Sequence, residues 1–147
     1  MSHRRTRKSE YISDCRFQIA DFSVATITTP DMLRERTKRL ALRTIRLCRT
    51  LPRNQESSII IRQLLRASTS VGANYRAVCR ARSTADFVSK LGIVLEEADE
   101  TLFWIEPLVD SGIAPPDRVA PLLAEANELV SIFVASLRTS KGLKSAI

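Results

Sequence analysis

The sequence predicts an all-α fold: an antiparallel up-down four-helix bundle with a poorly ordered N-terminal extension. Apolar residues recur at helical spacing in four stretches after residue 29, and short polar or proline-containing interruptions separate these stretches. The composition is 44% hydrophobic but only 5% aromatic, so aliphatic side chains form the core and strand-rich folds are disfavoured. With 147 residues, the chain is long enough for one domain with one core.

Residues 1–29 differ from the rest of the chain. They contain a short basic run from His3 to Lys8 and no sustained helical period. We therefore expect a flexible extension at 1–29, a bundle at 30–141 and a C-terminal tail at 142–147. The alternative for the first segment is a basic arm that binds phosphate groups.

The first helix is predicted at residues 30–51. Thr29 is a suitable cap, Pro30 suits the first helical position, and Asp31 favours the positive end of the helix dipole. The expected core positions are Leu33, Thr37, Leu40, Ala41, Thr44, Leu47, Cys48 and Leu51. A basic stripe about 80° wide lies away from them and consists of Arg36, Arg39, Arg43 and Arg46.

The second helix is predicted at residues 57–80. Asn74 lies on the side of its core stripe, where an amide needs hydrogen-bond partners, so we expect a structural bond that fixes register rather than a ligand site. The core stripe consists of Ile60, Leu64, Ala67, Val71 and Val78. A second basic stripe on another face contains Arg62, Arg66, Arg76 and Arg80, with Arg82 following the helix.

The third and fourth helices are predicted at residues 84–111 and 117–138. Ser83 and Asp86 resemble a capping box, Pro107 is expected to kink the last turns, and Gly112 is a suitable stop. Asp117 is the expected cap of the fourth helix. The core positions of the two helices are Phe87, Leu91, Val94, Leu95, Ala98, Leu102, Ile105 and Val109, then Val119, Leu122, Ala126, Leu129, Phe133 and Leu137.

Catalytic residues, metal ligands and cofactor-binding motifs are not predicted. The single histidine, His3, precludes a histidine-based triad or di-iron motif, and no glycine-rich phosphate loop is present. The best acidic cluster is Glu96, Glu97, Asp99 and Glu100, whose members spread around the third helix instead of converging. Three cysteines without a CxxC spacing favour a reduced, cytoplasmic compartment. Because the sequence has no uninterrupted run of about 18 apolar residues, a membrane-spanning helix is not predicted.

Charge is unevenly distributed along the chain. Residues 1–82 carry 18 basic and six acidic side chains, whereas residues 83–147 carry five basic and ten acidic ones. The total of +7 therefore combines a first part of +12 with a second part of −5. A basic surface attracts RNA or DNA, and it equally attracts the acidic part of a second copy. Charge alone does not choose between these partners.

A candidate oligomer interface lies on the third helix. Ile93 and Trp104 share a sector away from the core stripe, beside Glu97 and Glu100. Apolar side chains clustered on a surface often mark a partner site, so this sector is predicted to contact another copy. The alternative is that Trp104 covers the bend at Pro107 within one subunit.

Residues 63–76, which read QLLRASTSVGANYR, resemble a signature of one bacterial family, and residues 80–91 and 95–101 extend the likeness. On these residues the chain resembles the four-helix-bundle protein family, also called the 23S ribosomal RNA intervening-sequence protein family. The resemblance runs from Met32 to about residue 137.

The resemblance implies a four-helix bundle that assembles as a homopentameric ring. Some members of the family are encoded within insertions in large-subunit ribosomal RNA genes. A related branch contains accessory proteins of diversity-generating retroelements, which bind nucleic acid and a reverse transcriptase. The expected function is a non-enzymatic, homo-oligomeric scaffold that binds a protein or nucleoprotein partner. The alternative is a nucleic-acid-binding protein that uses the arginine stripes of the first two helices.

Overall fold

The computed structural model describes residues 28–145, and their side chains as far as Gly142. Four helices account for nearly all of this region: α2 (Pro30–Arg49), α3 (Gln55–Val78), α4 (Thr84–Asp110) and α5 (Pro116–Ser145). Residues 28–145 contain no strand, which confirms the predicted all-α class. The extension predicted at residues 1–29 lies, except for its last two residues, outside the described part of the chain.

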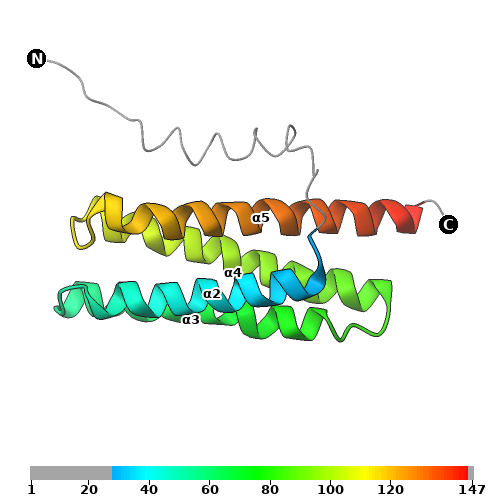
Figure 1. Cartoon of the computed structure of the whole chain (residues 1–147), viewed down its shortest axis with the longest axis horizontal. Coiled ribbons are helices and arrows are strands. Elements are labelled where there is room, and N and C mark those ends of the chain that lie inside the picture. The colour runs from blue at the N-terminus through cyan, green and yellow to red at the C-terminus, as the bar shows by residue number, and fades with distance from the viewer. Residues whose placement is uncertain (1–27, 146–147) are drawn as a thin grey trace, which may run out of the picture.

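The helices run alternately in opposite directions, as Figure 1 shows. Helix α2 packs against α3 and α5, and α4 packs against the same two helices. Helices α2 and α4 are therefore diagonal in the bundle, and their outward faces point in opposite directions. This diagonal relation decides where the charged surfaces of the molecule lie.

Side-chain caps set the starts of both α2 and α3. Thr29 Oγ1 accepts a hydrogen bond from the Met32 backbone N–H at 3.2 Å, as predicted. Helix α3 begins two residues earlier than predicted because Asn54 caps it. Asn54 Oδ1 accepts from the Ser57 N–H at 2.8 Å, and Ser57 Oγ accepts from the Asn54 N–H at 2.9 Å. This reciprocal pair is a capping box, and both of its residues are visible in the sequence.

Helix α4 begins where its cap predicts, and glycine ends it. Ser83 Oγ accepts from the Asp86 N–H at 3.1 Å, whereas the Asp86 carboxylate accepts from the Arg82 N–H instead of closing the predicted box. Pro107 does not end the helix, which continues to Asp110. Gly112 follows with φ 77°, a conformation that glycine adopts without the steric cost of a Cβ.

Helix α5 differs from its prediction at both ends. Its first residue is Pro116, so Asp117 lies in the first turn, and its expected role as the cap is wrong. Proline suits that position because its missing N–H would have no partner there. The helix also continues to Ser145, past the predicted end at residue 138. Among the side chains described, which end at Gly142, Leu137 is the last buried one although the backbone stays helical, which explains why the sequence pattern ended early.

The four apolar stripes meet in one core. Tyr75, which the sequence reading omitted, is also buried there and stacks on Phe133 with ring centroids 5.8 Å apart. Burial and the neighbouring Cys79 raise the pKa of the Tyr75 hydroxyl. The largest fully buried apolar side chains are Phe133, Leu40, Leu64, Leu91, Ile105, Leu108, Leu129, Val71, Val94 and Val119.

Helix α5 is also long and apolar enough, by length and composition, to span a membrane over Pro116–Gly142. The same composition is expected of a bundle helix that supplies much of the core. In the structure, α5 buries Leu129 and Phe133 and pairs Glu125 with an arginine of α2. These contacts support the role of a core helix.

Candidate interaction surfaces

Arg36, the first member of the predicted basic stripes, is engaged within the chain. Its Nε lies 2.9 Å from Glu125 Oε1 and its Nη2 lies 3.0 Å from Glu125 Oε2, a bidentate pair between α2 and α5. Its Nη2 also lies 3.1 Å from Glu128 Oε1. The Arg36 and Glu125 side chains are only 19% and 16% exposed, and the hydrogen bond to Glu125 raises the pKa of Arg36. The arginine therefore ties two helices together and is not free to bind a phosphate.

Arg66 is engaged in the same way, by the residues predicted to form an oligomer interface. It forms ion pairs with Glu97, at 3.3 Å, and with Glu100, both on α4. Glu100 Oε1 also accepts a hydrogen bond from Trp104 Nε1 at 3.1 Å. The bonds from Arg66 and Trp104 lower the pKa of Glu100. Glu97, Glu100 and Trp104 thus belong to a network that joins α3 to α4 within one subunit.

The other seven predicted arginines are exposed, and none forms an ion pair with a residue between 28 and 145. Three of them lie within four residues of Leu42 on α2, an apolar side chain that is 41% exposed. We call this set, Arg39, Leu42, Arg43 and Arg46, the arginine face of α2. The other four are Arg62, Arg76, Arg80 and Arg82.

Helix α4 presents exposed apolar side chains on its outer side. Ile93, which was predicted to lie there, is 47% exposed, and Phe103 is 54% exposed. The Phe103 ring meets the half-buried Trp104 ring edge to face, with centroids 4.9 Å apart. Sequence reasoning missed Phe103, although its position off the core stripe of residues 98, 105 and 109 was a usable signal.

Acidic side chains surround Phe103 on the same helix. We call Glu96, Asp99, Phe103, Glu106 and Asp110 the acidic face of α4. Burial, then repulsion from Asp110 and Asp99, raises the pKa of Glu106. Glu96, Asp99 and Glu106 make no ion pair within the described chain. Exposed surfaces of opposite charge therefore lie on diagonal helices.

The remaining sequence candidates are not assembled into a reactive site. Asn74 is half-buried, and its amide has no hydrogen-bond partner among residues 28–145, so the expected register-fixing bond is not found there. Solvent reaches the amide and can satisfy it. Cys48 is buried, which raises the pKa of its thiol to about 11, and Cys79 is an exposed free thiol. Within the described region, no three histidine, cysteine or carboxylate side chains are grouped to hold a metal.

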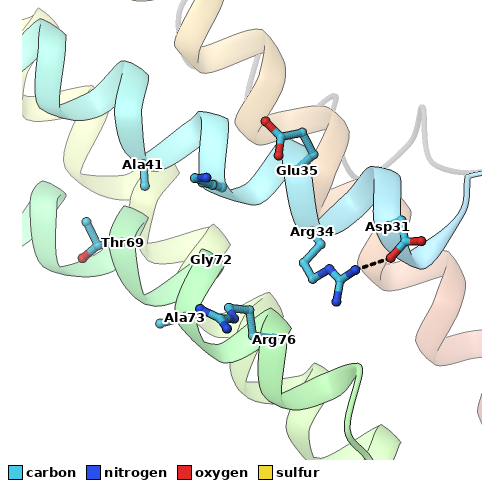
Figure 2. A pocket seen from close by; sticks show the side chains of 9 residues that line it. Asp31, Arg34, Glu35, Ala41, Thr69, Gly72, Ala73 and Arg76 are labelled. Carbon is cyan, nitrogen blue, oxygen red and sulfur yellow. Dashed lines mark hydrogen bonds and ion pairs between the residues drawn. The ribbon is translucent and has the colours of Figure 1, made fainter.

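An open groove of about 520 Å³ lies between α2 and α3, as Figure 2 shows. Its walls carry three cationic and two acidic side chains, and Ala41, Gly72 and Ala73 leave space between them. A Cβ on Gly72 would lie 3.3 Å from the Thr37 carbonyl oxygen, so this glycine permits the close approach of the two helices. The lining residues are Asp31, Arg34, Glu35, Lys38, Ala41, Thr69, Gly72, Ala73 and Arg76.

Comparison with known proteins identifies the family. A family model described as "23S rRNA-intervening sequence protein" matches residues 32–135. The chain belongs to this family. The 23S rRNA-intervening sequence match extends from the first turn of α2 into the second half of α5. It includes both charged faces and every residue that lines the groove except Asp31. It confirms the resemblance inferred from residues 63–101.

A solved structure agrees with this assignment. It is the crystal structure, at 1.70 Å resolution, of a protein of unknown function from the S23 ribosomal protein family of Bacteroides thetaiotaomicron. The two chains are 28% identical and superpose with a TM-score of 0.68, and the match covers 74% of this chain and 97% of the other. No curated protein matches this member of the 23S rRNA-intervening sequence family.

Proposed function

We propose that the protein is a non-enzymatic, homo-oligomeric scaffold that binds a protein or nucleoprotein partner. In the proposed assembly, the arginine face of α2 in one copy contacts the acidic face of α4 in the next. The observation that supports this proposal is the diagonal placement of two exposed surfaces with opposite charge, each of which includes an exposed apolar side chain.

Physical reasoning favours such a contact over two isolated faces. Burial, then repulsion from Asp110 and Asp99, raises the pKa of Glu106, and arginines from a second copy would offset the repulsion. Leu42 and Phe103 would be removed from water in the same contact. Because two different surfaces meet, the contact is head-to-tail and can close into a ring. A ring of five is the form that the family resemblance implies.

Sedimentation measurements test this assembly. Replacing Leu42 and Phe103 together by serine is expected to lower the mass at about 20 µM toward that of a monomer, because the apolar part of the contact is lost. Ile59→Ser is the matched control, since Ile59 is 55% exposed but lies on α3, outside both faces. The control is expected to keep the wild-type mass. A wild-type protein that sediments as a monomer would contradict the proposal.

A second candidate function is nucleic-acid binding, which the seven exposed arginines without ion pairs favour. Phosphate backbones would neutralise them, and repetition around a ring would strengthen modest contacts. The exposed aromatic ring of Phe103 lies on the acidic face, so the arginine face offers no stacking platform for bases. Binding by charge without sequence readout is therefore the mode that this surface would support.

Retention of single-stranded RNA tests this candidate. Replacing Arg39, Arg43 and Arg46 by alanine should weaken binding and reduce the slope of log affinity against log salt by about 2, since each phosphate contact contributes roughly 0.7. Arg36 is unsuitable for this set because it holds Glu125. Helicity measured by circular dichroism controls for folding. Absence of retention by the wild-type protein at low salt would eliminate nucleic-acid binding.

A further inference from the structure

The floor of the groove between α2 and α3 consists of small residues. Ala41 comes from α2, and Gly72 and Ala73 come from α3. Because Gly72 has no Cβ, α3 can lie close to the Thr37 carbonyl of α2, so a ligand above this floor can meet side chains of both helices at once. A compact group with several hydrogen-bond acceptors would suit this geometry.

Two cations reach the groove from opposite helices without a partner in the described chain. Lys38 lies on α2 and Arg76 on α3, and both are exposed and form no ion pair with residues 28–145. Figure 2 shows the Arg76 side chain beside Gly72 and Ala73. The third cation, Arg34, is paired with Asp31. Two positive charges of the groove are therefore available to an anion.

The charged side chains that line the groove, three cationic and two acidic, sum to +1. Glu35 opposes an anion, but in Figure 2 its side chain points away from α3. The Thr69 hydroxyl donates its hydrogen to the Leu65 carbonyl oxygen at 2.7 Å, so it offers a ligand only acceptor capacity. Donors to a ligand would come from Lys38 and Arg76, a point-charge ammonium and a planar guanidinium, which together suit the several oxygens of a phosphate.

We propose that this groove binds a phosphate group, with Lys38 and Arg76 donating hydrogen bonds to its oxygens from the two sides. The site goes beyond the scaffold function, because it needs only one subunit and lies outside the acidic face of α4. It would bind the phosphate of a free ion, a nucleotide or a nucleic-acid strand, since these groups share the same chemistry.

The test uses the full chain and three variants. Calorimetric titration with inorganic phosphate, in chloride buffer of constant ionic strength, measures the affinity. Lys38→Gln with Arg76→Gln is expected to weaken binding about tenfold or more, because two charge-assisted donors are lost. Ala73→Gln leaves the charge unchanged but places a longer side chain in the groove, and it is also expected to weaken binding. Arg39→Gln with Arg46→Gln removes two charges outside the groove and is expected to leave the affinity within twofold.

Two further probes, adenosine monophosphate and a fluorescent single-stranded oligonucleotide, distinguish the phosphate source. A probe supports the site if the groove variants weaken its binding and the Arg39 and Arg46 control does not. The probe that binds the wild-type protein most tightly identifies the source of the phosphate. Equal weakening by the Arg39 and Arg46 control would show diffuse attraction and overturn the proposal, as would no measurable binding of any probe at low salt. Sedimentation of the same variants separates the two proposals. A groove variant that dissociates the assembly without changing phosphate affinity would make Lys38 and Arg76 interface residues and overturn the site.

Discussion

Single side chains in this bundle show how a partner within the chain changes the role of a charge. Arg66 resembles the exposed arginines of α3 in sequence, yet it is paired with Glu97 and Glu100. Glu100 in turn holds the indole N–H of Trp104, the only tryptophan of the protein. The emission of this one residue therefore reports on the protonation of Glu100.

The fluorescence of Trp104 is predicted to titrate at a pH below 4.5, the ordinary pKa of a glutamate. The folded state lowers the pKa of Glu100. The ionised Glu100 therefore stabilises the fold fully at a pH above the ordinary glutamate pKa, and this stabilisation is lost as the pH falls through the lowered pKa of the folded state. Arg66→Gln removes the largest cause of the shift, so the fluorescence midpoint should move to higher pH. Arg62→Gln, an exposed neighbour on the same helix, should leave the midpoint unchanged. An identical midpoint in the Arg66 variant would contradict the role of the ion pair.

At the scale of elements, the two glycines inside α3 and α4 differ in what surrounds them. A Cβ at Gly72 would meet the backbone of the fully buried Thr37 at 3.3 Å, whereas a Cβ at Gly92 would meet nothing within 4 Å. Alanine is the better helix former by about 1 kcal/mol. Local propensity and packing therefore oppose each other at Gly72 but not at Gly92.

We predict opposite signs for the two alanine substitutions. Gly92→Ala should raise the free energy of unfolding by about 0.5–1 kcal/mol through helix propensity. Gly72→Ala should lower it by about 1 kcal/mol, because α2 must move away from α3 and core contacts loosen. Urea denaturation followed by circular dichroism measures both values. A stabilised Gly72→Ala protein would show that the two helices separate at little cost.

The sequence was sufficient to predict the helices, but not every helix end or side-chain partner. Thr29, Ser83 and Gly112 act within one turn of their own positions, so local chemistry identified them correctly. The cap at Asn54 was equally local and was overlooked. The end of α5 carries no apolar period, so periodicity could not indicate it.

Partners across helices follow a different rule. Arg36 and Arg39 occupy the same predicted stripe, yet only Arg36 forms an ion pair within the described chain. The difference depends on the rotation of α2 relative to α5, which places Glu125 beside one arginine and not the other. Spacing along one helix contains no information about that rotation. The candidate surfaces could therefore be predicted as stripes, but their available members could not.

At the scale of the whole molecule, the uneven charge of the chain becomes a spatial separation. The basic first part of the sequence forms α2 and α3, the acidic second part forms α4 and α5, and the diagonal packing of α2 and α4 sets the two faces apart. Arg36 and Arg66 each pair with two carboxylates of the second part within the subunit. The arginine face of α2 and the acidic face of α4 are two of the charged surfaces that stay on the outside of the bundle.

A pair of charge-reversed variants tests whether these two faces meet. Replacing Glu96, Asp99 and Glu106 together by lysine makes the α4 face basic, and Arg39→Glu with Arg46→Glu makes the α2 face acidic. Each of these variants alone opposes like charges across the head-to-tail contact, so each is expected to sediment as a monomer. When the two variants are mixed in equal amounts, every contact between a copy of one and a copy of the other again joins opposite charges. Assembly should therefore return. Strict alternation of two copies cannot close an odd ring, so the restored species should be an even ring or an open chain rather than a pentamer. If the mixture stays monomeric while wild-type protein assembles, the two faces do not contact each other.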